Sequence, residues 1–290
     1  DWMGAFGTHP QVKTPNLDRL AEWGTLFTNA HVQAPVCNPS RVSIMTGLRP
    51  TTTGIYGLAP GHRQTEVTKN VVTLPQHFAK NGYRTLSAGK IFHGITSEIK
   101  EAADFQEWGP DQNFGPFPEE KIVKAPLDMV DHPLVDWGVF PKEDDSLLGD
   151  YPVATWAVDQ LKRFGSGQKE KPFFMAVGFV SPHVPLYATQ KWFDLYPEEE
   201  NIVLPPAPVG DRKDIPNFAW YTHWFLPEPR LSWVMENNEW RHKVRSYLAT
   251  ISFMDAQVGR VLDELNAQGL DDNTIVVLWS DHGYHLGEKG

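Results

Sequence analysis

The longest apolar run in the chain is Phe173-Phe174-Met175-Ala176-Val177-Gly178-Phe179-Val180, eight residues without a charged or hydrogen-bonding side chain. The run is far shorter than the roughly 20 apolar residues that cross a bilayer. It also lacks the alternation of a strand with one face in water. Continuous runs of this kind are typical of strands buried on both faces, as in parallel sheets covered by helices. The run therefore predicts an α/β fold around a mostly parallel central sheet.

The segments on either side of this run alternate between helical and strand patterns. Thr14-Pro15 is a typical helix start and Gly24 a typical end, and apolar residues recur at helical spacing from Glu236 to Gln268. We therefore expect helices to sandwich the sheet. The predicted helices are residues 14–24, 73–82, 151–164 and 236–268, and the further predicted strands are residues 83–88 and 274–279.

Two long stretches, residues 94–150 and 197–233, follow neither pattern. Both are rich in proline, tryptophan and aspartate, and they are too aromatic to be disordered linkers. Loops of this length inside a compact domain are usually functional or packed over a site. We expect the same of these two stretches.

The composition is that of a soluble globular protein and excludes several classes of function. The 290 residues include 26 Lys and Arg against 36 Asp and Glu, a net charge of −10, and 41% are apolar. This excess of acids argues against nucleic acid as a partner, because its binding depends on basic residues that neutralise phosphates. No apolar run is long enough for a membrane span. The single cysteine, Cys37, excludes an intrachain disulfide.

Both ends of the chain are abrupt. It begins with Asp1-Trp2-Met3-Gly4, without an initiator methionine or a signal segment, and it stops at Gly290. We therefore expect a chain that is truncated at both ends, with any signal peptide outside it.

Polar side chains follow three of the predicted strands at their carboxyl ends. They are Lys90, His93, His183, Asp281 and His282. In a mostly parallel sheet these ends meet at one edge, where ligands bind. One carboxylate, three imidazoles and one ammonium group are therefore expected to converge there. The alternative is that each of them is a solvated loop residue.

The thiol lies in a further candidate element of the site, residues 35–41. Asn38 is a natural helix cap and Pro39 a natural first helical residue, so Cys37 is predicted to lie just before a helix N-terminus. The partial positive charge there favours an anion or lowers a thiol pKa. Arg41, one turn further on, could pair with an oxyanion. The alternative is a buried structural cysteine.

Several segments of the chain resemble the sulfatase family, in the same order along the sequence. The most specific are Cys37-Asn38-Pro39-Ser40-Arg41, similar to the signature Cys-x-Pro-Ser-Arg, and Gly82 to His93, similar to the second sulfatase signature. Thr14 to Leu20 and the segment that starts at Ser280 match as well. The chain is most similar to the iduronate-2-sulfatase-like branch, through Met254 to Arg260 and Ser280 to Glu288.

This resemblance spans nearly the whole chain and implies an alkaline-phosphatase-like α/β fold. Residues 1–290 would form a partial sulfatase catalytic domain, without the first strand and the C-terminal subdomain of the family. Further metal-binding aspartates and a further active-site lysine are expected outside the chain.

The resemblance also implies a role for each candidate residue. Cys37 would be oxidised to formylglycine, whose hydrated aldehyde attacks the sulfur of a sulfate ester and then expels sulfate by internal elimination. The implied catalytic residues are Cys37, Arg41, Lys90 and His93, the substrate-binding residues are His183 and Lys90, and the metal ligands are Asp281, His282 and Cys37.

The implied cofactors are calcium, with magnesium as the other option, and the formylglycine made from Cys37. The implied partners are a sulfated saccharide as substrate and a formylglycine-generating or sulfatase-maturing enzyme. Neither nucleic acid nor a membrane span is expected. The implied location is extracytoplasmic, that is periplasmic, secreted or lysosomal.

One departure from the iduronate branch concerns specificity. Val180 and Ser181 stand where that branch has His and Lys before the Pro-His pair. We therefore expect a cationic contact near the substrate to be missing and iduronate to be a poor substrate. Two alternatives to a sulfatase remain open: a phosphate or phosphonate monoester hydrolase that uses the same aldehyde, and a non-catalytic carbohydrate-binding relative.

Overall fold

The computed structural model describes residues 2–123, 134–167, 171–219 and 229–289. Besides short 3-10 turns, these residues form helices and two parallel sheets. The strands are β1 (Arg84–Gly89), β2 (Glu107–Asp111), β3 (Trp137–Val139), β4 (Phe173–Gly178) and β5 (Leu186–Ala188). The helices are α1 (Pro15–Trp23), α2 (Cys37–Thr46), α3 (Pro50–Thr53), α4 (Leu74–Lys80), α5 (Ser97–Glu101), α6 (Asp150–Gly165), α7 (Gln190–Phe193), α9 (Leu231–Glu236) and α10 (Trp240–Ala267).

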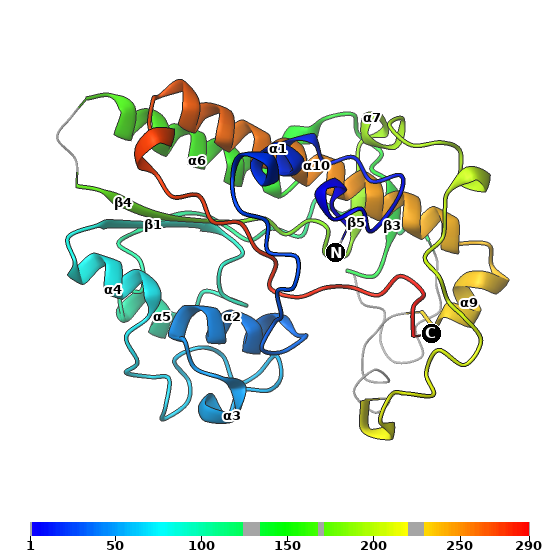
Figure 1. Cartoon of the computed structure of the whole chain (residues 1–290), viewed down its shortest axis with the longest axis horizontal. Coiled ribbons are helices and arrows are strands. Elements are labelled where there is room, and N and C mark those ends of the chain that lie inside the picture. Colours follow the sequence, from blue (N-terminus) through cyan, green and yellow to red (C-terminus); the bar gives the residue numbers. More distant parts are fainter. Residues whose placement is uncertain (1, 124–133, 168–170, 220–228, 290) are drawn as a thin grey trace.

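The main sheet has the order β2-β1-β4, and its strands are parallel. β1 and β4 pair in register from Arg84 opposite Phe173 to Gly89 opposite Gly178, so both strands end at the same level. Helix α6 packs against the three strands on one face, and α4 packs against β1 on the other (Figure 1). The predicted α/β class and the parallel sheet flanked by helices are confirmed.

The two strands approach each other closely where they end. Gly89 has a φ of +73°, in the left-handed region that favours glycine, and a Cβ there would lie 1.9 Å from the carbonyl oxygen of Gly178. The amide of Lys90 donates to the same carbonyl at 2.8 Å. This contact fixes the points at which the chain leaves β1 and β4, and the two segments that follow carry Lys90 and His183.

The largest core lies beside the second sheet, in which β3 and β5 pair in parallel. Helix α10 packs against both of these strands and against α6, and it buries Val244, Leu248 and Ala249 completely. Within the described ranges, no helix combines the length and the apolar character that a membrane crossing requires.

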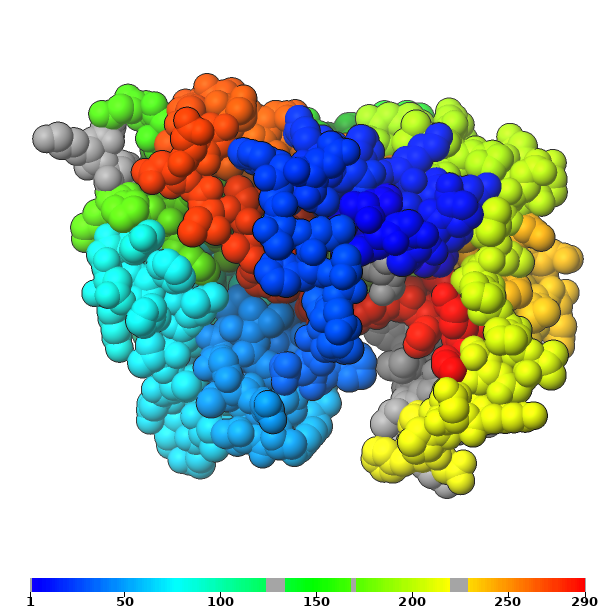
Figure 2. Space-filling model, in the orientation of Figure 1, coloured from blue at the N-terminus to red at the C-terminus, as the bar shows by residue number. Residues whose placement is uncertain are grey.

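Helix α1 is attached to α10 by one buried carboxylate. Asp255 of α10 accepts hydrogen bonds from the backbone amides of Asn16 and Leu17 at 3.2 and 2.8 Å, and thus satisfies free amides at the start of α1. This bond holds the N-terminal segment over the helical layer. In Figure 2 that segment (blue) lies across the middle of the visible face, and the segment after α10 (red) emerges on both sides of it.

Most predicted elements are present, with small differences in their bounds. The predicted helices correspond to α1, α4, α6 and α10, and the strands predicted at 83–88 and 173–180 correspond to β1 and β4. β4 differs in burial, since its residues are half-buried rather than buried on both faces. The reason is its place at the edge of the sheet, where one side has no neighbouring strand among the described residues.

The strand predicted at residues 274–279 is wrong. These residues form no strand, and Ile275 and Val277 are 92% and 67% exposed. An apolar run becomes a buried strand only where a neighbour takes up its backbone hydrogen bonds, and none of the described strands pairs with this one. The segment instead crosses in front of the main sheet in the view of Figure 1 and leads to Asp281 and His282.

Candidate active site

The site is built around the N-terminus of α2, and Cys37 is the first residue of that helix. The prediction that Cys37 lies just before the helix, with Asn38 as its cap, is wrong. Val36 takes the cap position, with an extended backbone at φ −144° and ψ 139°. The side-chain amide of Asn38 instead donates to the carbonyls of Gly57 and Pro60 at 3.0 and 2.9 Å. Asn38 thus holds that later loop, and Cys37 lies inside the first helical turn, with 6% of its surface exposed.

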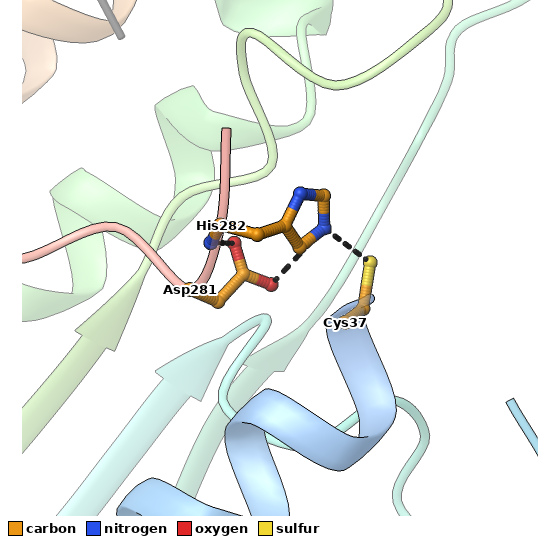
Figure 3. A group of neighbouring side chains, drawn as sticks. All are labelled: Cys37, Asp281 and His282. Atoms are coloured by element: carbon orange, nitrogen blue, oxygen red, sulfur yellow. Dashed lines mark hydrogen bonds and ion pairs between the residues drawn. The ribbon is translucent and has the colours of Figure 1, made fainter. Parts of the chain in front are cut away.

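Two ionisable side chains contact the thiol directly. The Sγ atom of Cys37 lies 3.1 Å from Nε2 of His282 and 3.6 Å from Nζ of Lys90. The other ring nitrogen of His282 donates to the carbonyl of Gly283 at 2.7 Å, so Nε2 is the nitrogen turned toward the sulfur. Figure 3 shows Cys37 at the start of α2 meeting Asp281 and His282, which come from the segment after α10.

The guanidinium of Arg41 joins the segments that form the site. Its Nε donates to Oδ2 of Asp281 at 2.8 Å, and its Nη1 donates to the carbonyls of Lys90 and Ile91. The ion pair is largely buried, with side-chain exposures of 13% for Arg41 and 16% for Asp281. Arg41 therefore orients the carboxylate and the end of β1. Its predicted contact with a reacting oxyanion stays a prediction.

The two remaining candidates, His93 and His183, also face the thiol. Both act on the pKa of Cys37 and lower it. Nδ1 of His183 donates to the carbonyl of Val184 at 2.7 Å, which leaves its Nε2 for the site. The chain thus brings together all the candidate residues that the sequence singled out, while their catalytic roles stay predictions.

The charges around the thiol favour its ionised form. Burial raises the pKa of Cys37, but hydrogen bonds from the three surrounding histidines and the charge of Lys90 outweigh burial and lower the pKa to about 2. Burial also lowers the pKa of Lys90, against the opposing effect of the nearby thiolate. The hydrogen bond with the thiolate raises the pKa of His282. The site therefore stabilises negative charge at position 37.

The thiol of the unmodified chain should titrate far below its usual range. Because Cys37 is the only cysteine, the ultraviolet absorbance of a thiolate reports this group alone. We expect the absorbance of the folded chain to persist to below about pH 4, whereas the unfolded chain should lose it below about pH 8.5. A folded chain whose thiol titrates above neutral pH would contradict the arrangement described here.

Cys37, Asp281 and His282 form the group of described residues that could hold a metal ion, since one ligand atom of each lies within 4.8 Å of the others. This donor set does not fit calcium, which takes about six to eight oxygen ligands. Its single carboxylate is already paired with Arg41, and a thiolate and an imidazole are softer donors. The described residues alone therefore do not make a calcium site, and we derive no catalytic step through a cation.

Two residues that contact the candidates were missed by sequence reasoning. The ring of Phe114 lies 5.1 Å from Nζ of Lys90 and 5.1 Å from the ring of His183. Asp150, the first residue of α6, accepts hydrogen bonds from the segment that leads to His183. The expectation that residues 94–150 pack over a site covers both positions but singles out neither. In the sequence, Asp150 resembles any acidic residue at a helix start.

Comparisons with known proteins agree with one another. A family model described as "Sulfatase" matches residues 1–290. A curated "Sulfatase" of Formosa agariphila is 45% identical over 96% of this chain and 55% of its own length. The iduronate 2-sulfatase of Homo sapiens is 34% identical over 99% of this chain and 53% of its own length. The chain thus spans about half the length of the curated relatives it matches.

Solved structures show the same fold. One described as a 2-O GAG sulfatase has a TM-score of 0.61 and 22% identity, and the match covers 95% of this chain and 54% of the other. A phosphonate monoester hydrolase of Agrobacterium radiobacter has a TM-score of 0.64 and 16% identity, over 93% and 57% of the two chains. At these identities the likeness concerns the fold alone.

Proposed function

The chain belongs to the sulfatase family, and on this basis we propose that the protein hydrolyses sulfate esters with a nucleophile formed from Cys37. The observation that carries the proposal is the surrounding of Cys37 by Lys90 and three imidazoles at the N-terminus of α2. These groups would meet both the nucleophile and the sulfate, whose charges must be offset during the reaction. A merely structural cysteine has no need of such surroundings.

We propose that residue 37 carries formylglycine in the mature protein. That group would supply a hydrated aldehyde, one oxygen of which can attack sulfur while the other allows sulfate to be expelled. Its place in the first turn of α2, within reach of His282 and Lys90, supports the assignment. Mass spectrometry of a peptide that spans residues 34–41, from protein made in its natural host, tests it. An aldehyde lighter than the thiol is expected, and a fully unmodified cysteine would count against the proposal.

The surrounding side chains would then provide charge and hydrogen bonds. Lys90 is 3% exposed and would offset the charge that grows on the leaving oxygen. His93 and His183 would donate hydrogen bonds to the sulfate or to the group at position 37. Arg41 would keep the carboxylate of Asp281 in place through their ion pair.

Replacing Lys90 with alanine should lower kcat more than it weakens substrate binding. The ammonium group lies 3.6 Å from Sγ of Cys37, where it would meet charge that develops only in the transition state. We expect kcat on an aryl sulfate to fall on the order of 100-fold, with a much smaller change in KM. Lys80→Ala, at the end of α4, is the matched control. A raised KM with unchanged kcat would show that Lys90 only binds substrate.

We propose sulfated saccharides as the substrate class. The support comes from relatives, since one is an iduronate 2-sulfatase and a structural neighbour is described as a 2-O GAG sulfatase. The same proposal includes a formylglycine-generating or sulfatase-maturing enzyme as partner. It also includes an extracytoplasmic location, where sulfated polysaccharides would be met.

A second candidate function is the hydrolysis of phosphate or phosphonate monoesters. The fold that the chain shares with a phosphonate monoester hydrolase, with a TM-score of 0.64, is compatible with this chemistry. Turnover of an aryl sulfate, an aryl phosphate and an aryl phosphonate by the full-length protein decides between the two. The sulfate should have the highest kcat/KM, and a preference for either phosphorus ester would replace the first proposal.

A further inference from the structure

Asp150 is a buried carboxyl group at the back of the site. It is 1% exposed, and its two oxygens accept hydrogen bonds from the backbone amides of Val180 and Ser181 at 2.6 and 2.9 Å. Burying a carboxyl group is costly unless its oxygens find such donors. The two bonds therefore hold the start of α6 to the segment that follows β4.

That segment carries His183, one of the imidazoles that face the thiol. The amide of His183 donates to the carbonyl of Val180 at 2.9 Å, so the four residues from 180 to 183 form one turn. Asp150 holds the first two residues of this turn, and its last residue provides the imidazole. A shift at Val180 or Ser181 would therefore move the ring of His183 relative to position 37.

The turn borders a small cavity on one side. A cavity lies beside it, lined by Asp150, Ser181 and His183 together with Phe114 and other residues. On this side the turn is not fully packed, so its hydrogen bonds to Asp150 are expected to contribute to its position.

We propose that Asp150 is a positioning residue, which places His183 against the group at position 37 by fixing the backbone of Val180 and Ser181. This inference rests on the proposed function, in which His183 contacts the sulfate. Asp150 touches neither substrate nor nucleophile in this role. It acts only through the turn.

The arrangement also changes the interpretation of Ser181. From the sequence, the absence of a lysine at this position was expected to remove a cation from the substrate. The backbone amide of Ser181 donates to Asp150, so residue 181 belongs to the support of the turn. Serine brings no cation to this position, and the expectation of a poor fit to iduronate stays a prediction.

The experiment compares Asp150→Asn with Asp159→Asn in the full-length protein. The asparagine keeps the shape of the side chain, but its NH2 group faces a backbone amide that needs an acceptor. Asp159 lies exposed on the same helix and serves as the matched control. Hydrogen exchange at the amides of Val180 and Ser181 measures the bonds, and calorimetry with inorganic sulfate measures the site.

We expect Asp150→Asn to speed exchange at both amides and to weaken sulfate binding about tenfold, with a similar loss in kcat/KM on an aryl sulfate. The control variant should change neither quantity. In a His183→Ala background, Asp150→Asn should have no further effect on sulfate binding, because the two residues act through one turn.

Two results would overturn the inference. One is unchanged exchange at Val180 and Ser181 in the Asp150→Asn variant. The other is a loss of sulfate affinity that is just as large when His183 is already absent. If the parent protein neither binds sulfate nor hydrolyses the ester, the proposed function fails. In that case two measurements still decide whether Asp150 positions the ring of His183. They are the exchange rates and the place of that ring in a crystal structure of Asp150→Asn.

Discussion

Full-length protein in which alanine replaces Cys37 should lose sulfate ester hydrolysis and keep its fold. Removal of a nucleophile on which the other groups converge costs on the order of 10⁴-fold or more in kcat. Substitution by alanine removes both the thiol and the group that could be made from it. Turnover of an aryl sulfate measures the effect, and circular dichroism with a thermal melt shows whether the fold persists.

The matched control for this variant is Ser43→Ala. Ser43 lies in the same helix, is also 6% exposed, and makes its hydrogen bond to the carbonyl of Pro39 within α2. Both variants should lower stability by about 1 kcal/mol, while only the change at Cys37 should remove activity. If Cys37→Ala retained a tenth of the parent turnover, the nucleophile would lie elsewhere. Loss of activity in both variants would point to damage to α2 rather than to chemistry.

The sequence was most informative where a residue's place depends on its immediate neighbours. The apolar run at 173–180 indicated a parallel sheet because strands of that kind have no polar face. Thr73 and Gln76 form the capping box at the start of α4, which local pattern also places correctly. The convergence of Lys90 and His183 followed from one rule, that parallel strands present their carboxyl ends at one edge. His282 reaches the same place from a segment that forms no strand.

The predictions failed where distant parts of the chain compete for the same group. Asn38 is a good helix cap, but the carbonyls of Gly57 and Pro60 take its amide, and no local pattern reveals them. Residues 274–279 have a strand pattern, yet a strand exists only where a partner strand pairs with it. Asp150 could not be recognised for the same reason, because its partners are thirty residues away in the sequence.

The largest loss of stability is expected from Arg63→Ala. Arg63 and Asp104 are 3% and 0% exposed, and the guanidinium donates to both carboxylate oxygens, at 3.0 and 2.6 Å. It also donates to the carbonyls of Thr68 and Val71 at 3.2 and 2.6 Å. Its removal leaves the buried carboxylate with the hydroxyl of Thr73 but without a cation, and it takes the donor from several carbonyls. We expect a loss of about 3–5 kcal/mol in the free energy of unfolding.

The buried ion pair of Arg63 and Asp104 lies close to the site. We therefore expect Arg63→Ala to alter the surroundings of His93 as well. The ring of His62, which precedes Arg63, stacks on Phe92 with 5.0 Å between the ring centroids, and Phe92 precedes His93.

Denaturant unfolding of the full-length protein measures the loss of stability in Arg63→Ala. Arg84→Ala is the control, because its ion pair with Glu107 is exposed at 48% and 23% and should contribute less than about 1 kcal/mol. Equal effects of the two variants would contradict the argument from burial.

The difference between the parent and Arg63→Ala should also depend on pH in a defined direction. Burial raises the pKa of Asp104, but hydrogen bonds from Arg63 and Thr73, together with the charge of Arg63, outweigh burial and lower it. A carboxyl group whose pKa is lower in the folded state contributes stability that is fully present above its unfolded pKa of about 3.9 and is lost as the pH falls through the folded value. Because the unfolded state is common to both proteins, the difference in unfolding free energy should shrink as the pH falls toward the lowered folded pKa of Asp104 in the parent. A difference that grew on acidification would show that Asp104 is protonated in the folded protein, and the buried ion pair would then not be the source of the stability.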